Sequence, residues 1–233
     1  MSLLTIVQKT CRRLSLAAPS VVVTSTDAQV LQLWELANEA GDDMARDFDW
    51  QMLRKEQTFV TVATPEQSNV IPSDFSRFIS DSFFNRSTRR QLFGPITPQQ
   101  WQAIQAQPQL NRIFLAYVER NGAFLVTPTP TAGETIAFEY VSNQWCQSAT
   151  AVGQSEFLAD TDTGIISERL LILSLRWRFL QAKGLDYAEA LRTYEVEIEK
   201  TKGRDGGNTI INVTGEGQYI LSPNLPEGSF PGP

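Results

Sequence analysis

Histidine is absent from the 233-residue sequence, which removes the side chain that most often serves as a general base or a metal ligand. Without histidine, no Ser-His-Asp or Cys-His nucleophilic arrangement can be built. No phosphate-binding glycine loop or nucleophile elbow occurs either. We therefore expect no catalytic residues, no cofactor and a protein that is not an enzyme.

Cysteine is nearly absent as well, with Cys11 and Cys146 alone. Two thiols are too few for a zinc site, and one falls in a predicted helix while the other ends a predicted strand. Free cysteines are usually buried and act as small hydrophobic side chains. We expect that role for both, and no metal site.

Long hydrophobic runs are missing too. The longest, Leu170 to Leu173, is far shorter than the ~20 residues that span a bilayer. The N-terminus lacks the pattern of a signal peptide, so we expect a cytosolic chain that does not associate with membranes. The net charge of −6 disfavours tight wrapping of nucleic acid, because such binding depends on neutralising phosphates.

Helical periodicity marks the first fifty residues. Apolar positions from Leu3 to Leu16 share one face. Thr26 and Gln29 are then spaced as a capping box, which predicts the start of a long second helix. That helix has one apolar face, and the remainder of its surface is polar and acidic.

A β-rich region follows. The segment 57–64 is dense in β-branched residues, and Asn121-Gly122 is a strong hairpin signal because both positions suit positive φ. With a second turn at Ala132-Gly133, the pattern predicts an antiparallel meander of the segments 113–118, 123–127 and 135–141. A further capping box, Thr97 to Gln100, predicts a short helix within this region.

Two helices, 165–183 and 186–202, are predicted near the C-terminus, with Gly184 at the left-handed position between them. On a helical wheel the first has two apolar faces separated by two polar seams. One seam contains Ser167, Ser174, Arg178 and Gln181, and the other contains Arg169, Arg176 and Lys183. Such a helix suits either the centre of a monomeric bundle or a subunit interface, where the second seam would face an acidic strip.

The predicted fold class is therefore α+β: a helical bundle built from N- and C-terminal helices, with an inserted antiparallel β domain and an extended C-terminal tail. We expect residues 1–52 plus 160–207 to form the bundle, 53–159 the β domain and 208–233 the tail. The tail has two short β-prone runs and no core of its own, so we expect it to bind a partner by strand addition.

Few residues could support chemistry or nucleic-acid contact. The carboxylate pairs Asp42-Asp43 and Asp160/Asp162 fit a solvated helix face and a helix cap, with Asp162 or Thr163 as the cap, better than a catalytic or calcium site. Near three phenylalanines, Phe83, Phe84 and Phe93, lie Arg86, Arg89 and Arg90. This cluster is either a strand pair with solvated arginines or a contact for DNA or an acidic partner.

Three segments carry a resemblance to a known family. The first segment begins with VQKTCRRLSLAAPS near the N-terminus. The second is TPTPTAGETIAFEYVSNQW in the centre, and the third is LLILSLRWRFLQAKGLDYAEALRTYEVEIEKTKGRDGG near the C-terminus. In this order they resemble the head-to-tail adaptor proteins of short-tailed bacteriophages, of the tail tubular protein A type, over roughly residues 3 to 207.

The resemblance implies a structural virion protein at the head-tail interface, made in the host cytoplasm. It implies a homo-oligomeric ring, commonly of twelve subunits, between the portal protein and the tail nozzle, with tail fibre proteins as possible neighbours. Packaged double-stranded DNA would pass through without sequence-specific binding. The helical part forms the ring in that family, so the subunit interface candidates are Trp34, Arg169, Arg176, Trp177 and Lys183.

Two other functions stay open from the sequence. An aromatic-rich β region with exposed carboxylates also suits a carbohydrate-binding or carbohydrate-cleaving virion module. A single-stranded nucleic-acid binder would use Arg86 to Arg90 and would show salt-dependent affinity.

Overall fold

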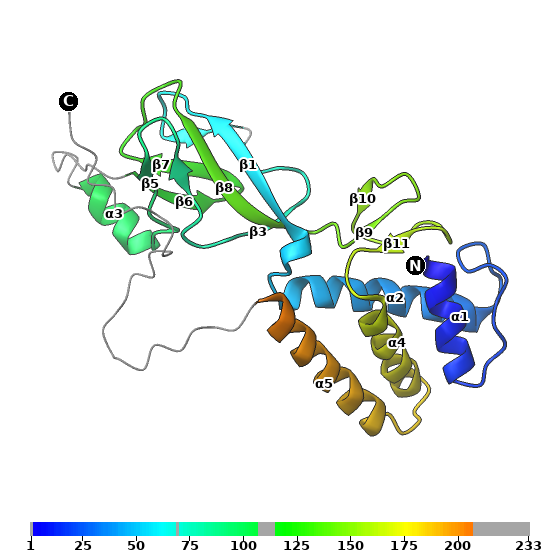
Figure 1. The fold of residues 1–233 in the computed structure, drawn as a ribbon. Coiled ribbons are helices and arrows are strands. Elements are labelled where there is room, and N and C mark those ends of the chain that lie inside the picture. Colours follow the sequence, from blue (N-terminus) through cyan, green and yellow to red (C-terminus); the bar gives the residue numbers. More distant parts are fainter. Residues whose placement is uncertain (1, 69, 107–114, 207–233) are drawn as a thin grey trace.

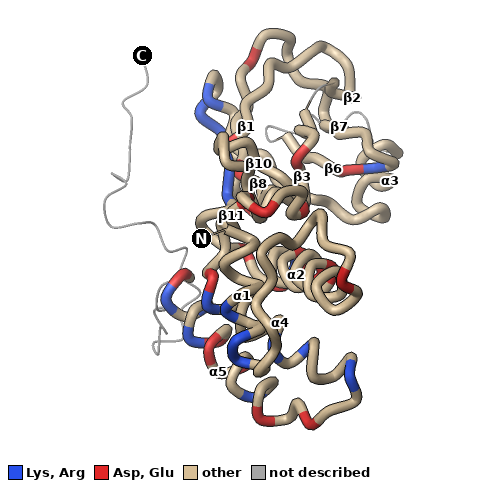
Figure 2. The backbone as a smooth tube through the Cα atoms, turned by 90° about the vertical axis from the view of Figure 1, so that its right-hand side faces the viewer, with Lys and Arg blue, Asp and Glu red and all other residues tan. Residues whose placement is uncertain are grey.

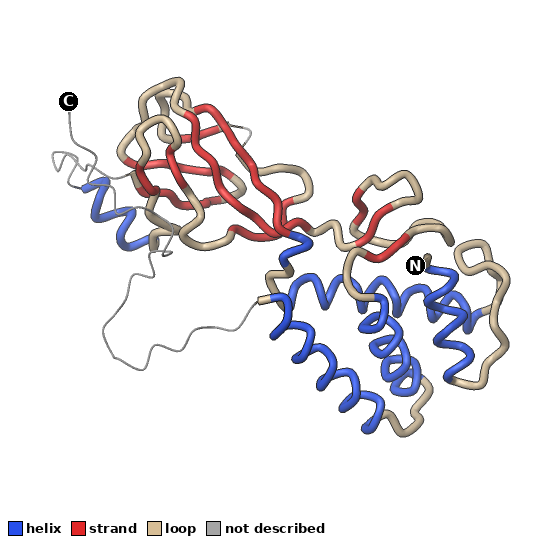
Figure 3. The backbone as a smooth tube through the Cα atoms, in the orientation of Figure 1, coloured by secondary structure: helices blue, strands red, loops and turns tan. Residues whose placement is uncertain are grey.

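The computed structural model describes residues 2–68, 70–106 and 115–206. Most of the helices gather at one end of the molecule, together with a small sheet, and the larger antiparallel sheets lie at the other end with one short helix (Figures 1 and 3). The N-terminal helices pack with the C-terminal helices, and the sheets are inserted between them in sequence, which confirms the predicted α+β class. The predicted tail, 208–233, lies outside the described residues.

Four helices form the bundle: α1 (Leu3–Arg13), α2 (Ala28–Asp47), α4 (Glu168–Ala182) and α5 (Ala188–Asp205). Helix α4 contacts each of the other three. Both of its apolar faces contribute buried side chains, and even Ser174 on one polar seam is buried. The single chain therefore already places α4 at the centre of a bundle, and the exposed positions of the other seam are left for a further contact.

Side-chain caps mark the starts of α3 and α2. The capping box of α3 (Pro98–Ala106) is confirmed, because Thr97 and Gln100 exchange backbone-to-side-chain hydrogen bonds of 2.9 and 3.2 Å. The predicted cap of α2 is wrong by one residue. Asp27 caps it instead, its Oδ1 accepting from the Gln29 amide at 2.8 Å, because a carboxylate is the stronger acceptor at a positive helix end.

The α4 cap also differs from the prediction. Ser167 is its N-cap residue, whereas Asp162 lies five residues earlier in a loop. There the Asp162 carboxylate accepts hydrogen bonds from the amides of Leu158 and Ala159, both at 2.8 Å. Asp162 therefore closes the loop that precedes the helix. Gly184 has a φ of +68° and ends the α4 segment as predicted.

The strands form three sheets. In the largest, β8 (Thr135–Ser142) pairs with β1 (Arg54–Val60), β3 (Phe75–Phe78) and β4 (Phe84–Asn85), and β4 pairs with β5 (Arg90–Gln91). A second sheet contains β2 (Glu66–Gln67), β7 (Ala123–Thr127) and β6 (Ala116–Arg120). A small third sheet beside the helices contains β10 (Gly153–Gln154), β9 (Cys146–Gln147) and β11 (Thr163–Gly164).

The predicted meander is only half right. Asn121 and Gly122 have φ values of +52° and +74° and join β6 to β7 as expected. After the turn at Gly133, however, β8 pairs with β1 and not with β7. Thr61 redirects it: the Thr61 carbonyl accepts from the Gly133 amide at 2.9 Å, and its own amide donates to the Glu134 carbonyl at 2.8 Å. Residues 113 and 114 of the first predicted strand lie outside the described ranges.

An aromatic cluster fills the space between the two larger sheets. Phe83 stacks on Phe138 with ring centroids 4.6 Å apart, and Phe124 approaches Phe59 edge-to-face at 5.8 Å. All four rings are buried. Because β7 and β8 point their aromatic residues at each other across this core, they stack as layers of two sheets and do not share one ladder.

The helical core also receives residues from the segment after β8. Trp145 and Phe157 are fully buried there, in edge-to-face contact at 4.8 Å. The predicted domain boundaries stay a prediction, but this segment contributes to the core of the bundle. From the β side, Arg77 reaches the end of α2 and donates to the carbonyls of Ala45 and Phe48 at 3.2 and 2.8 Å. These carbonyls have no partner within the helix, so Arg77 fixes the junction.

A methyl group at Gly41 would overlap the Trp145 ring. We expect Gly41→Ala to lower the free energy of unfolding by about 1–3 kcal/mol, because the packed ring cannot move aside. Gly203 is the matched control: it also lies within a helix, and an added Cβ there meets no atom within 4 Å. Gly203→Ala should raise stability by about 0.5–1 kcal/mol through helix propensity. Urea unfolding of both variants checks this, and equal effects would contradict it.

A polar network at the base of the large sheet predicts an acid-sensitive contribution to stability. Burial would raise the pKa of Asp74, but hydrogen bonds from Lys55 (2.6 Å), Ser142 (2.9 Å) and Tyr140 (3.0 Å) outweigh it and hold the pKa below its ordinary value of 3.8. A carboxyl group whose pKa is lowered on folding stabilises the protein above its unfolded pKa, and that stabilisation is lost as the pH falls through the folded pKa.

We therefore expect Asp74→Asn to be less stable than wild type at pH 7 by about 1–3 kcal/mol, since it loses the charged acceptor. Its stability should also fall less steeply than that of wild type below about pH 4, because the titrating group is gone. Ser142→Ala removes one of the three donors, so its stability at pH 7 and the steepness of its loss in acid should lie between those of wild type and Asp74→Asn. Denaturation midpoints measured across this pH range test the prediction. If the midpoints of all three proteins fall equally steeply with decreasing pH, the role of Asp74 is contradicted.

Candidate assembly interface

The seam of α4 that the sequence singles out is a partly exposed strip of three cations, Arg169, Arg176 and Lys183, called the basic strip below. Arg169 forms an ion pair of 3.0 Å with Glu197 of α5, but 68% of its side chain stays exposed. The Lys183 ammonium lies 5.2 Å from the centre of the Phe179 ring. The Arg176 Nε is buried and has no hydrogen-bond partner among the described residues.

Arg178, on the opposite polar seam, supplies the contact between α4 and the acidic helix. Its two terminal nitrogens donate to Glu39 and Asp43 of α2, each at 2.5 Å, and its Nε donates to Ser174 at 3.1 Å. The Arg178 side chain is only 11% exposed, whereas both carboxylates are more than half exposed. Within one chain, then, Arg178 faces α2, and the basic strip lies elsewhere on α4.

The two tryptophans among the interface candidates are both partly buried. Trp34 donates its ring N–H to the Phe157 carbonyl at 2.9 Å and so ties α2 to the loop before α4. Trp177 packs near Tyr187 and Tyr194, with ring centroids 6.4 and 6.2 Å away. Its ring nitrogen is buried and has no acceptor among the described residues. The Arg178 guanidinium lies over the Trp177 ring, 4.8 Å from its centre, so Trp177 packs on the side of α4 that faces away from the basic strip.

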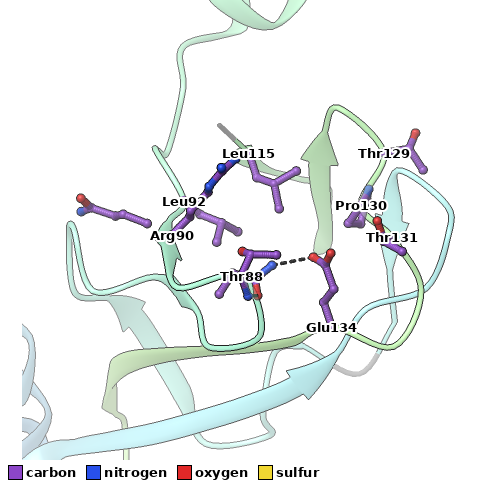
Figure 4. A pocket seen from close by; sticks show the side chains of 10 residues that line it. Thr88, Arg90, Leu92, Leu115, Thr129, Pro130, Thr131 and Glu134 are labelled. Carbon is purple, nitrogen blue, oxygen red and sulfur yellow. Dashed lines mark hydrogen bonds between the residues drawn. The ribbon is translucent and has the colours of Figure 1, made fainter. Parts of the chain in front are cut away.

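The arginine cluster of the β region is on the hairpin of β4 and β5. Arg86 pairs with Glu56 of β1 at 2.8 Å, and both side chains are about half exposed. Arg90 lines a cavity of about 170 Å³, in which the Asn85 amide donates to the Glu134 carboxylate at 2.6 Å (Figure 4). Arg89 has a φ of +57° in the connecting turn.

The neighbouring phenylalanines separate into two roles. Phe84 and Phe93 are nearly half exposed, whereas Phe83 is fully buried in the aromatic core. Of the three, Phe83 therefore supports the fold. The exposed pair and the arginines remain candidates for contact with an acidic partner.

Other groups that could support chemistry are used by the fold. Both cysteines are buried as predicted, and burial raises the pKa of the Cys146 thiol to about 12. The Asp160 carboxylate accepts from the amides of Val22 and Val23. Within the described ranges no three potential ligand side chains gather as a metal site, and no helix is long and apolar enough to cross a bilayer.

A groove that the sequence does not reveal lies between α2 and the edge of the β region. We call it the acidic groove; its volume is about 660 Å³. It is lined by Asn38, Glu39, Asp42, Ala45, Arg46, Phe75, Ser76, Asn143, Ser155 and Glu156. The lining comes from separate segments, so no local pattern could predict it. The acidic face of the second helix was the one available signal.

The charged surfaces lie on different sides of the bundle. In Figure 2 the Lys and Arg positions of α4 and α5 lie mostly to the left, and acidic positions of α2 lie to the right. The acidic groove contains three carboxylates and one guanidinium, that of Arg46, which pairs with Asp42 at 2.8 Å.

Comparison with known protein families identifies the family of this chain. Residues 1–208 match the SU10 adaptor protein family, and the chain belongs to that family. It is thus a phage adaptor protein, and the family implies a structural role in the virion. Comparison with curated proteins gives no match.

The double ion pair of Arg178 should stabilise the bundle measurably. We expect Arg178→Met, which keeps the aliphatic stem, to lower the free energy of unfolding by about 1–3 kcal/mol, because two carboxylates lose a shielded partner. Arg46→Met is the control: it also faces an α2 carboxylate, but 73% of its side chain is exposed, so the loss should be under about 0.5 kcal/mol. Urea unfolding measures both, and an Arg178 effect no larger than the control's would refute this role.

Proposed function

We propose that this protein is the head-to-tail adaptor of a short-tailed phage, of the tail tubular protein A type. The single observation that carries the proposal is the family match over residues 1–208. In this proposal the chain forms a ring, commonly of twelve subunits, between the portal protein and the tail nozzle, with tail fibre proteins as neighbours. The protein works by holding these parts together, without catalysis or a cofactor.

The charge of the chain supports the passage of double-stranded DNA through such a ring. A net charge of −6 leaves no large positive field to neutralise phosphates, and strong phosphate contacts would hold the DNA in place. A weakly repelling lumen allows DNA to slide without sequence-specific contacts. The proposed ring is therefore a channel for DNA, and its affinity is directed at proteins.

The subunit interface in this proposal involves the helical bundle. The basic strip is open to a partner, and both Arg176 and Trp177 carry buried donors without an acceptor among the described residues. Arg169 and Lys183 of the strip are exposed, so carboxylates of a partner would reach these two cations. The arginine cluster on β4 and β5 is a second contact candidate, for the portal or the nozzle.

Electron microscopy of the protein mixed with the portal of the same phage tests this function. We expect rings seated on the portal, with a lumen wide enough for double-stranded DNA. A chain that stays monomeric and does not attach to the portal, but binds glycans, would instead support a carbohydrate-binding module. Affinity for single-stranded DNA that falls with salt and with loss of Arg86, Arg89 and Arg90 would support a nucleic-acid binder.

Removal of the tail tests its proposed part in assembly. We expect a chain that ends at Gly207 to keep its fold, because the last contacts of α5 are retained: the Asp205 carboxylate accepts from the Gln51 amide at 2.8 Å. We expect the same truncated chain to attach less tightly to the portal or to neighbouring subunits, since strand addition by the tail is lost. Circular dichroism checks the fold and co-sedimentation checks attachment. Unchanged attachment would remove the tail from the proposal.

A further inference from the structure

We propose that the acidic groove of one subunit receives the basic strip of a second copy of the chain. The inference rests on the proposed ring and deepens it by naming the two surfaces that meet. Its starting point is that the acidic groove lies beside a face of α2 on which Glu35 and Glu39 are exposed.

The acidic groove retains negative charge after its internal pairs are counted. Arg46 pairs with Asp42, and Arg178 reaches Glu39 from the bundle side, whereas the Glu156 carboxylate has no partner among the described residues. Glu35 lies further along the same exposed face of α2, also without a described partner. The surface therefore has carboxylate acceptors available for incoming cations.

The basic strip has complementary needs. Among the described residues, Arg169 alone of its three cations pairs with a carboxylate, and 68% of its side chain stays exposed. Arg169 and Lys183 are exposed, and Arg176 between them is partly exposed. Carboxylates from a second copy would pair with these cations, and charge-assisted hydrogen bonds are stronger than neutral ones.

The position of the two surfaces determines the kind of assembly. The strip is on α4, whereas the groove is lined by α2, β3 and two loops, and no ion pair joins strip and groove among the described residues of one chain. Contact between two different surfaces is heterologous, and its repetition produces a ring when the rotation closes. The occupant of the groove is therefore a second copy, because this chain carries the matching surface.

The test uses charge reversal on each surface. The strip variant is Arg176→Glu with Lys183→Glu, and the groove variant is Asp42→Lys with Glu156→Lys; Glu39 is left in place because Arg178 needs it. Each variant alone places like charges across the contact, and we expect its self-association to weaken at least ~tenfold relative to wild type. Sedimentation velocity, with and without portal, measures this, and circular dichroism confirms that both variants fold.

Mixing the two variants gives the decisive result. The strip variant retains its acidic groove and the groove variant retains its basic strip, while the two altered surfaces are opposite in charge. An equimolar mixture should therefore assemble with alternating subunits, although neither variant does so alone. Arg12→Glu with Arg13→Glu, exposed on α1 and equal to the strip variant in charge change, is the control that should assemble normally.

Three results would overturn the inference: a single variant that assembles like wild type, a mixture of folded variants that does not recover, or a wild-type chain that never self-associates. The proposed function fails separately. Rings that form on the portal with either variant would leave the adaptor role standing and remove this interface. Suppose instead that wild-type rings do not bind the portal, while the charge-reversal variants fail to assemble alone and assemble when mixed. That result would support the interface and contradict the adaptor role.

Discussion

The burial of α4 among α1, α2 and α5 is the constraint on which the rest of the structure depends. A helix that is apolar on two faces cannot be exposed, so the N-terminal helices must return to pack against it although more than a hundred residues separate them in sequence. Arg178 then sets how α4 sits against α2, because its short bonds to Glu39 and Asp43 need one register and one rotation of the helix. The basic strip is the part of α4 that this packing leaves partly exposed.

The same packing positions the groove. Trp145 fits against Gly41, where no side chain larger than hydrogen is accommodated, and this brings the segment after β8 onto α2. From the other direction, Arg77 satisfies the last carbonyls of α2 and fixes the start of the β region. The groove lies between these two attachments, so its shape follows from the junction.

Local features were predicted correctly where no neighbouring residue could form a competing interaction. The hairpin at Asn121 and Gly122 follows from the φ values that the turn needs, and the capping box at Thr97 is intact because no carboxylate is adjacent to it. The cap at Thr26 failed because Asp27 competes for the same helix end. The path of β8 failed for a different reason: its pairing depends on Thr61, some seventy residues earlier, which no local pattern contains.

The sequence by itself determined the α+β class, the two apolar faces of α4, the burial of both cysteines and the three basic positions at seven-residue spacing, because each depends on residue type and local periodicity. The resemblance to phage adaptors was likewise present in the sequence, and the family match confirms it at the level of an adaptor protein. Only the tertiary structure decided which seam faces α2, since Arg169 and Arg178 carry the same charge and differ only in direction around the helix. It alone produced the groove, because a surface formed by side chains from α2, β3 and two loops exists only after those segments have packed together.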